Sequence, residues 1–427
     1  MRIEPATAVR GDVAVPGDKS ISHRALLVGA IADGESEIRG FGASADTLAT
    51  AAAVQGLGAA VEQDGARVVV QGVGLRGLRA AGGPIDCGNA GTLLRLLPGV
   101  LAGHEGRFEL VGDESLSRRP LERIAEPLRS MGAAVETTDG HAPLVVEGGQ
   151  LWPIRYELPV ASAQVKSCIL LAGLYASSGP TVVVERYPSR DHTERMLVAS
   201  GARVGRKPGE SSVWPAERLR PVSLDVPGDF SSAAPFVLAA TLLPGSELRL
   251  HGIGLNPTRT GFLAVLERMG ARVSVFNRRQ VGGEPVADLE VEAAELVATE
   301  VGEAEVPQLV DELPLFALAA GLARGESVVK GAQELRVKES DRIETVTNVL
   351  GPLGIRISGT HDGFRVRGVP SRPQGGGVVD AAGDHRIAML AAIAGLMSRE
   401  GVEIRGAEAT EISFPDFFAM LDSIALR

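Results

Sequence analysis

Polar and charged residues gather at the points where apolar helices are expected to begin. The first turn of a helix leaves backbone N–H groups without intrahelical partners and carries the positive end of the helix dipole, so it favours anionic ligands. Lysine and arginine at the same points strengthen that preference. We therefore expect these residues to bind anions. The segments are residues 17–24 (GDKSISHR), 87–92 (CGNAGT), 161–166 (ASAQVK), 310–312 (VDE) and 383–386 (GDHR). A further set of polar segments, residues 118–120, 189–191 and 338–342, lies where amphipathic helices are expected to begin.

An internal repeat indicates which elements position these residues. The tetrapeptide VPGD occurs at residues 15–18 and again 211 residues later, at 226–229. Similar starts near residues 86, 159, 307 and 380 divide the chain into six units of about 70 to 80 residues. Each unit reads as β-α-β-α-β-β, with a buried helix followed by an amphipathic one. Examples are helices at 25–32, 313–323, 46–57 and 341–350, and strands at 36–39, 327–330, 271–276, 288–291, 355–358 and 364–367.

The repeat also separates charges that the fold needs from charges that it does not need. At the offset of 211 residues, Lys19 corresponds to Phe230, and Arg24 corresponds to Pro235. Because the same unit is built with and without these cations, we expect both to bind a ligand. Asp18, Ser20 and Thr92 have the alternative of being ordinary helix caps and turn formers. Alignment of the third and sixth units places Gln164 opposite Arg386 in the first helical turn.

The two VPGD turns divide the chain into two expected domains of three units each. The first comprises residues 15–226, and the second comprises residues 227–427 together with residues 1–14. No linker rich in Pro, Gly or Ser separates them, so both turns are expected to act as hinges.

Composition excludes several classes of partner. With 43 Lys and Arg against 53 Asp and Glu, the net charge of −10 argues against binding to nucleic acid or to an anionic membrane. An anionic ligand must therefore meet a local cluster of cations, and each of the five lysines is informative. The two cysteines form no C-x-x-C pair, so neither a zinc site nor a disulfide framework is expected. Because no signal peptide or membrane-length apolar run occurs, we expect a cytoplasmic protein.

Other motifs are weak. Residues 72–77 (GVGLRG) match the dinucleotide-binding pattern, but residues 82–84 (GGP) leave no room for the long helix that this pattern opens. The chain has no phosphate-binding loop of the G-x-x-x-x-G-K type, no H-E-x-x-H and no G-x-S-x-G. We expect no metal site. His23, His192 and His385 are interpreted as packing or orienting groups, and Cys87 and Cys168 as buried residues.

Taken together, the polar segments resemble the motifs of the enolpyruvylshikimate phosphate synthase family, the 3-phosphoshikimate 1-carboxyvinyltransferases. The resemblance implies an α/β fold of two domains, each an inside-out α/β barrel of three βαβαββ units, closing over a cleft that helix N-termini face. We expect ligands to drive this closure, because the cations of the expected site come from both halves of the chain, so that each substrate would draw the halves together. The motifs follow the family's order along the whole chain, at residues 16–24 (PGDKSISHR), 88–92 (GNAGT), 115–120 (SLSRRP), 161–167 (ASAQVKS), 336–342 (RVKESDR) and 384–386 (DHR).

The resemblance further implies a reaction between two small anions, shikimate 3-phosphate and phosphoenolpyruvate. The 5-hydroxyl of shikimate 3-phosphate adds to C2 of phosphoenolpyruvate as C3 is protonated, and phosphate then leaves the tetrahedral intermediate. This chemistry serves the shikimate pathway, and needs neither a metal nor an organic cofactor. The expected enzyme is a monomer that binds no nucleic acid and no membrane.

Roles for individual residues also come from the resemblance. Shikimate 3-phosphate would be bound by Lys19, Ser20, Arg24, Ser162, Ala163, Gln164, Arg190, Asp311 and Lys338. Phosphoenolpyruvate would be bound by Lys19, Asn89, Gly91, Arg119, Gln164, Arg342 and Arg386. Asp311 would take the proton of the 5-hydroxyl, Glu339 would carry the proton at the methylene carbon, and Lys19 would assist. Seven of these residues are cations, beside substrates with about six negative charges, which suggests a near-neutral balance.

Two positions bear on the ligands. Some family members carry a Lys near the C-terminus that contacts phosphoenolpyruvate, whereas this chain has Ile412 there. Certain relatives tolerant of the inhibitor glyphosate carry Ala at the position of Gly91, so we expect this enzyme to be sensitive.

Two alternatives remain. Enolpyruvyl transfer to UDP-N-acetylglucosamine is the nearest one, but that relative uses a reactive Cys in the loop that here comprises residues 115–120 and contains none. A non-catalytic repeat protein would carry basic residues over an outer face, which the acidic balance disfavours.

Overall fold

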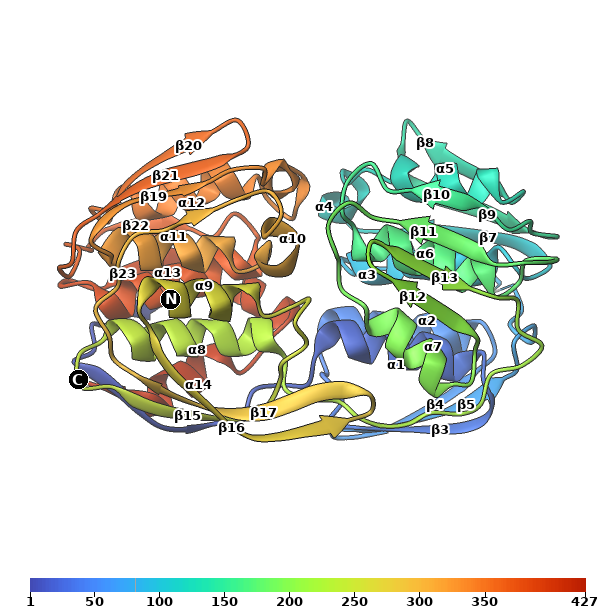
Figure 1. Cartoon of the computed structure of the whole chain (residues 1–427), viewed down its shortest axis with the longest axis horizontal. Coiled ribbons are helices and arrows are strands. Elements are labelled where there is room, and N and C mark those ends of the chain that lie inside the picture. Colours follow the sequence, from blue (N-terminus) through green and yellow to red (C-terminus); the bar gives the residue numbers. More distant parts are fainter. Residues whose placement is uncertain (81) are drawn as a thin grey trace. The chain divides into compact units, whose positions relative to one another are not determined.

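The computed structural model describes residues 1–80 and 82–427 and divides the chain into two compact units (Figure 1). The N-terminal unit comprises residues 17–227 and 280–284, and the C-terminal unit comprises residues 1–16, 228–279 and 285–427. Both mix helices with several sheets, so the α/β class predicted from the sequence is confirmed.

Within the described residues, the N-terminal unit contains three four-stranded sheets of one design. In each sheet an edge strand pairs in parallel with its neighbour, and the other pairs are antiparallel. The repeat in the sequence is thus a repeat in topology. The sheets are β14-β3-β5-β4 (Ser223–Asp225, Asp33–Arg39, Arg67–Val73, Ala60–Asp64), β6-β7-β9-β8 (Ile85–Asp86, Gly106–Val111, His141–Gly148, Ala134–Thr138) and β10-β11-β13-β12 (Arg155–Glu157, Thr181–Val184, Glu210–Val213, Val204–Lys207).

Three helices of this unit, α1 (Lys19–Ala30), α3 (Gly91–Leu101) and α6 (Ala163–Gly173), are buried on nearly all sides. Beyond the polar residues of their N-terminal parts, these helices are apolar on every side, as expected for buried helices. Helices α3 and α6 pack closely, because a Cβ on Gly99 would lie 2.2 Å from the carbonyl oxygen of Cys168. Helices α2 (Ala45–Gly56), α5 (Glu122–Ser130) and α7 (His192–Ala199) expose one face, and α4 (Glu114–Ser117) is a single turn.

The C-terminal unit has three sheets in its described part. They are β16-β17-β15-β2-β24 (Arg272–Val281, Glu284–Glu292, Glu247–Gly254, Ala8–Val13, Ala425–Leu426), β18-β19-β21-β20 (Glu300–Val301, Gly325–Val329, Gly363–Gly368, Arg356–Thr360) and β1-β23-β22 (Arg2–Ile3, Val402–Arg405, Val378–Asp380). The tip of the β16–β17 hairpin, residues 280–284, belongs to the N-terminal unit.

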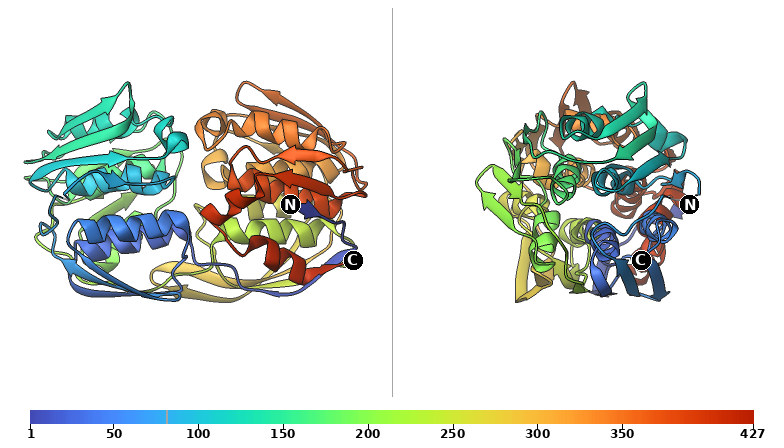
Figure 2. Two further views of the ribbon diagram at one scale, coloured as in Figure 1. Left: turned by 180° about the vertical axis from the view of Figure 1, so that it is seen from behind. Right: turned by 90° about the vertical axis from the view of Figure 1, so that its right-hand side faces the viewer.

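Helices α8 (Phe230–Leu242), α11 (Leu313–Leu322) and α13 (His385–Met397) form the interior of the C-terminal unit. As in the other unit, the strands lie outside the buried helices (Figure 2). The remaining helices are α9 (Gly261–Met269), α10 (Val306–Leu309), α12 (Arg342–Leu350) and α14 (Phe417–Ile424), with 3₁₀ turns η1 (Gln333–Val337) and η2 (Ala407–Ile412).

The strands that precede α1 and α8 are exchanged between the two units. Strand β2, which comes before α1, pairs with β15 of the C-terminal unit, and β14, which comes before α8, pairs with β3 of the N-terminal unit. The chain leaves β2 and β14 through the two VPGD turns. Each turn also ends in an aspartate that caps the following buried helix, Asp18 on α1 and Asp229 on α8.

No helix in the described part of the chain is both long enough and apolar enough to cross a membrane.

Candidate active site

Helix α1 begins with predicted site residues. Asp18 caps it by accepting a 2.9 Å hydrogen bond from the backbone N–H of Ile21. Lys19 and Ser20 are its first two residues, and the Nζ of Lys19 lies 2.8 Å from the Oδ2 of Asp46 on α2. The cation at the start of α1 is therefore already paired with a carboxylate of its own unit.

Arg24, one turn further along α1, is held by uncharged groups. Its Nε donates to Thr193 Oγ1 at 2.7 Å, its Nη2 donates to Ser167 Oγ at 2.9 Å, and its Nη1 donates to the carbonyl oxygen of Ser20 at 2.9 Å. Burial lowers the pKa of Arg24 to about 10, although the Glu194 carboxylate opposes this shift, so the side chain stays charged at neutral pH. A buried guanidinium with only neutral hydrogen-bond partners is suited to an anionic ligand.

A buried ionic triad lies behind Arg24. The Nζ of Lys166 lies 2.8 Å from Glu185 Oε1 and 3.0 Å from Glu194 Oε1, and it donates to the carbonyl oxygen of Ser189 at 3.2 Å. Burial lowers the pKa of Lys166, but the two carboxylates outweigh burial, so that the pKa lies above its usual value. The triad fixes the segment that carries Arg190, whose charge is close enough to Arg24 to contribute to its lowered pKa.

A second predicted group lies at the start of α3. The Nη2 of Arg119 donates to Asn89 Oδ1 at 2.8 Å, and Asn89 Nδ2 donates to Asp113 Oδ2 at 2.8 Å. A Cβ on Gly91 would lie 2.7 Å from Arg95 Nη1 and 3.1 Å from Arg119 Nη1. Gly91 therefore allows two guanidinium groups to approach this helix end.

Helix α6 supplies three more predicted residues. Ser162 caps it by accepting from the backbone N–H of Val165 at 3.4 Å, and Ala163 and Gln164 are its first two residues. Gln164 Nε2 donates to Thr92 Oγ1 on α3 at 3.3 Å. The N-termini of α3 and α6 are thereby joined through polar side chains.

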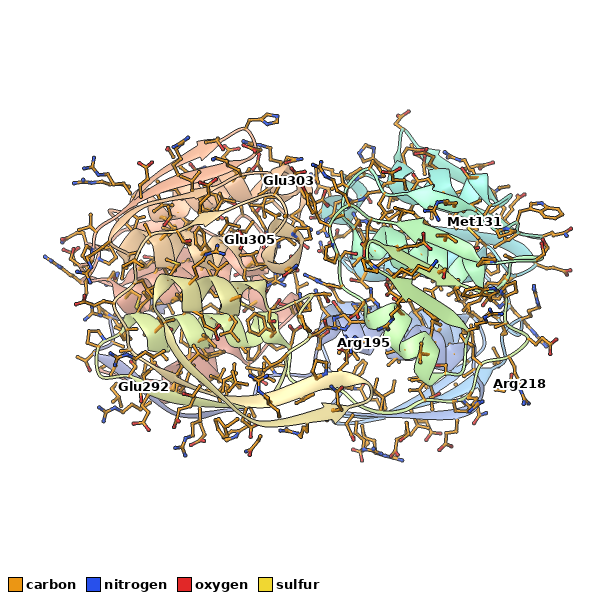
Figure 3. The ribbon with its side chains drawn as sticks, viewed as in Figure 1. Met131, Arg195, Arg218, Glu292, Glu303 and Glu305 are labelled. Carbon is orange, nitrogen blue, oxygen red and sulfur yellow. The ribbon has the colours of Figure 1, made fainter. Side chains whose placement is uncertain are left out.

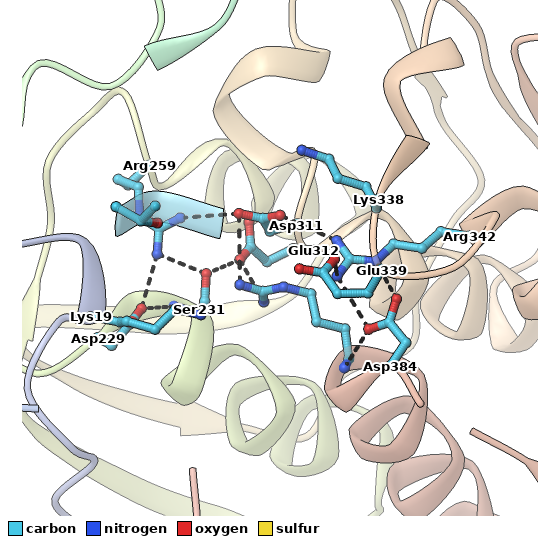
Figure 4. A network of polar contacts seen from close by, with 12 residues as sticks. Lys19, Asp229, Ser231, Arg259, Asp311, Glu312, Lys338, Glu339, Arg342 and Asp384 are labelled. Atoms are coloured by element: carbon cyan, nitrogen blue, oxygen red, sulfur yellow. Dashed lines mark hydrogen bonds and ion pairs between the residues drawn. The ribbon is translucent and has the colours of Figure 1, made fainter. Parts of the chain in front are cut away.

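In the C-terminal unit, Arg342 is the centre of a carboxylate cluster (Figure 4). Its Nε donates to Asp384 Oδ2 at 2.8 Å, its Nη2 donates to Glu339 Oε2 at 2.6 Å, and its Nη1 donates to Asp311 Oδ1 at 3.3 Å. Burial disfavours the charged form of Arg342, but these carboxylates outweigh burial and raise its pKa. Burial likewise acts to raise the pKa of Asp384, but Arg342 outweighs it and the pKa lies below its usual value.

Asp311 lies among three guanidinium groups. Besides Arg342, the Nη1 of Arg259 and the Nη2 of Arg386 each lie 3.6 Å from Asp311 Oδ2. Lys338 is adjacent, and burial lowers the pKa of its amine, although Glu334, 3.9 Å away, opposes that shift. A carboxylate among cations, beside an amine of lowered pKa, is a setting for proton transfer.

Arg259 is the functional candidate that the sequence interpretation missed. It lies just before α9, as Arg119 precedes α5 and Arg190 precedes α7. Aligning the second helices of the repeats would therefore have identified Arg259, because an arginine precedes each of these three helices.

The charge balance suggested by the sequence set seven cations against the charges of the substrates, and the structure adds carboxylates of the protein that this balance left out. In the C-terminal unit, six carboxylates accompany four cations of this cluster, and in the N-terminal unit Asp46 accompanies Lys19. The cluster around Arg342 is thus rich in carboxylates, whereas Arg24 has neutral partners. The cations are Arg259, Lys338, Arg342 and Arg386, and the carboxylates are Asp229, Asp311, Glu312, Glu334, Glu339 and Asp384.

The residues interpreted as non-catalytic are buried. His23 Nδ1 lies 2.7 Å from Thr50 Oγ1, and burial lowers the pKa of His23 to about 3. Cys87 and Cys168 are buried thiols, and burial raises the pKa of both, that of Cys87 to about 12. Across residues 1–80 and 82–427, no group of three or more His, Cys, Asp or Glu side chains could hold a metal ion.

The model of the family described as EPSP synthase (3-phosphoshikimate 1-carboxyvinyltransferase) matches residues 3–421. The chain belongs to this family. The resemblance inferred from the motifs is therefore confirmed. The 3-phosphoshikimate 1-carboxyvinyltransferase of Alkalilimnicola ehrlichii is 50% identical over 420 residues, 97% of this chain and 93% of the relative. That of Lactiplantibacillus plantarum is 48% identical over 420 residues, 98% of this chain and 97% of the relative.

Solved structures agree on the fold. EPSP synthase from Acinetobacter baumannii is 42% identical, with a TM-score of 0.88 over 100% of this chain and 98% of that chain. The enolpyruvyl transferase NikO of Streptomyces tendae, only 20% identical, has a TM-score of 0.80 over 99% of this chain and 96% of that chain, and so shares the fold. The predicted two-domain fold is thus confirmed.

Proposed function

We propose that this chain transfers the enolpyruvyl group of phosphoenolpyruvate to the 5-hydroxyl of shikimate 3-phosphate, releasing phosphate. The observation that carries the proposal is the family match over residues 3–421, together with relatives of that name at about half identity over almost the whole chain. The product, 5-enolpyruvylshikimate 3-phosphate, belongs to the shikimate pathway.

Shikimate 3-phosphate is proposed to bind residues of the N-terminal unit, with Asp311 and Lys338 added. The buried charge of Arg24 supports this role, because the three groups that accept hydrogen bonds from its guanidinium are all neutral. The helix N-termini of α1 and α6 add backbone N–H groups and the positive ends of their dipoles. The proposed residues of the N-terminal unit are Lys19, Ser20, Arg24, Ser162, Ala163, Gln164 and Arg190.

Phosphoenolpyruvate is proposed to bind arginines at other helix starts. Arg119 supports this role, since its guanidinium lies at the start of α3. Asn89 accepts a hydrogen bond from it, and Gly91 has no side chain that would displace it. Planar guanidinium groups match carboxylate and phosphate geometry. The proposed set is Lys19, Asn89, Gly91, Arg119, Gln164, Arg342 and Arg386.

The reaction needs two proton transfers, and the carboxylate cluster supplies candidates. Asp311 is proposed to take the proton of the 5-hydroxyl as its oxygen bonds to C2. Glu339 is proposed to protonate C3 in the addition and to take a proton from that carbon as phosphate leaves. Lys338 and Lys19 would stabilise the developing negative charge.

The test measures phosphate release from phosphoenolpyruvate with either shikimate 3-phosphate or UDP-N-acetylglucosamine as acceptor. We expect release only with shikimate 3-phosphate. Release with the amino sugar alone would establish the alternative enolpyruvyl transfer, and release with neither would overturn the proposal. The expectations of a cytoplasmic monomer that binds no nucleic acid remain predictions.

A further inference from the structure

Arg259 connects the N-terminus of α8 with the carboxylate cluster. It is 3% exposed. Its Nη2 donates to Asp229 Oδ1 at 2.9 Å and to Ser231 Oγ at 2.8 Å, both at the start of α8. Its Nη1 lies 3.6 Å from Asp311 Oδ2. The side chain is thus anchored on one helix and directed toward a carboxylate that precedes another (Figure 4).

The hydrogen bonds around Ser231 have a defined direction. Ser231 Oγ accepts from Arg259, so its single proton is available for Glu312 Oε1, to which it donates. Glu312 is buried, and burial raises its pKa, although Arg259 and Arg386 oppose the shift. Arg386 Nη1 lies 3.6 Å from Glu312 Oε1 and its Nη2 lies 3.6 Å from Asp311. Arg259 and Arg386 therefore share the same two neighbouring carboxylates.

The three guanidinium groups near Asp311 differ in what else they are proposed to do. Arg342 and Arg386 belong to the proposed phosphoenolpyruvate set, so a bound anion would compete with Asp311 for their charge. Arg259 is outside that set, and its anchors Asp229 and Ser231 are protein groups.

We propose that Arg259 is a positioning residue that keeps Asp311 ionised and in place while substrate occupies the other two arginines. This inference rests on the proposed function, because it takes Asp311 as the group that receives the hydroxyl proton. A cation within 4 Å favours the charged form of a carboxylate. Other charged groups act on Asp311 as well, namely Arg342, Arg386, Lys338 and Glu312.

The test compares the pH dependence of kcat in Arg259→Gln, Arg259→Lys and the unaltered enzyme. Loss of the cation favours protonated Asp311, so in Arg259→Gln the acid limb of the profile moves to higher pH by about one unit. Arg259→Lys keeps a charge and restores the limb to within a few tenths of a unit. As a matched control, Arg268→Gln removes a half-exposed arginine from the other end of α9, where it pairs with Glu305. This control leaves the profile unchanged.

A purely structural role for Arg259 would lower kcat by the same factor at every pH. An acid limb that stays in place in a folded Arg259→Gln enzyme would overturn the proposal.

A second measurement does not depend on activity. Without Arg259, the carboxylates near it lose compensation, so the variant is destabilised more at pH 7 than at pH 5 in urea unfolding. If the unaltered protein releases no phosphate with either acceptor, the proposed function fails, and this second measurement decides whether Arg259 compensates the cluster. Equal destabilisation of Arg259→Gln at both pH values would show that Arg259 does not compensate the carboxylates near it.

Discussion

Arg24 on α1 and Thr193 on α7 are joined by a 2.7 Å hydrogen bond, in which the guanidinium Nε donates to the threonine hydroxyl. The two residues are 169 positions apart in the sequence. The same hydroxyl lies 2.7 Å from Ser167 Oγ, which also binds Arg24. Helices α1, α6 and α7 are therefore linked through one buried guanidinium.

We predict that Thr193→Val weakens the binding of shikimate 3-phosphate about 10-fold. Valine keeps the shape of threonine but leaves a buried charged donor without its partner, which costs about 1 to 3 kcal/mol. Calorimetric titration measures the affinity. Thr193→Ser, which keeps the hydroxyl, is the control and should bind nearly as the unaltered protein does. Equal affinity in the valine variant would show that this hydrogen bond does not position Arg24.

Arg24→Ala and Asp311→Ala should separate binding from chemistry. We expect Arg24→Ala chiefly to raise KM for shikimate 3-phosphate, because it removes a contact to the anion. We expect Asp311→Ala chiefly to lower kcat, because it removes a proton acceptor. Steady-state kinetics at saturating phosphoenolpyruvate distinguishes them, and the reverse pattern would mean that the two roles are wrongly assigned.

Lys166→Met should destabilise the protein by about 3 to 5 kcal/mol at pH 7, since it removes the cation that pairs directly with both buried glutamates, Glu185 and Glu194. In the variant, burial penalises the charge of these two acids, so the folded state favours their neutral, proton-bound forms as the pH falls. Stability of the variant relative to the parent therefore improves as the pH falls from 7 to 5.

Urea unfolding at both pH values checks the effect of Lys166→Met. Lys207→Met, at a lysine side chain that is 78% exposed, is the matched control. A loss of the same size at both pH values would contradict the charge argument and indicate a packing defect instead.

His23 should contribute to acid sensitivity. Its folded pKa of about 3 lies below the ordinary value of 6.5, so the unfolded state binds a proton that the folded state excludes. The stability present above pH 6.5 is therefore lost as the pH falls below that value, by about 2 to 3 kcal/mol at pH 4.5. We predict that His23→Asn loses less stability than the parent between pH 7 and pH 4.5. A parallel loss in both proteins would refute the assignment.

Gly91→Ala should reduce inhibition by glyphosate. Its methyl group would lie 3.1 Å from Arg119 Nη1 and 2.7 Å from Arg95 Nη1, so at least one guanidinium must move. We expect millimolar glyphosate to inhibit the unaltered enzyme. For the variant, we expect the glyphosate concentration that gives half inhibition to rise about 10-fold, and phosphoenolpyruvate to bind less tightly. Inhibition assays against phosphoenolpyruvate check both, and an unaltered enzyme that millimolar glyphosate leaves fully active would contradict the expectation.

Much of the local structure could be predicted because its causes are local. The amphipathic pattern at 341–350 became α12 (Arg342–Leu350), and the apolar run at 313–323 became α11 (Leu313–Leu322). The strand pair predicted at 355–358 and 364–367 is β20 (Arg356–Thr360) and β21 (Gly363–Gly368). Hydrophobic periodicity, caps and glycine stops lie within a few residues of the elements that they specify. The positions of the motif residues at the starts of helices could be predicted for the same reason.

Tertiary structure alone decided which charges meet. Lys19 pairs with Asp46, Arg342 with Asp384 and Arg259 with Asp229, and these partners lie 27 to 42 positions apart. The pairing depends on which helix ends the packed core brings within about 4 Å, and no local pattern encodes that. A count of cations could therefore indicate an anion site but not its net charge. The exchange of β2 and β14 could not be predicted from local patterns either. Hydrogen bonding between strands far apart in the sequence is set by how the sheets assemble.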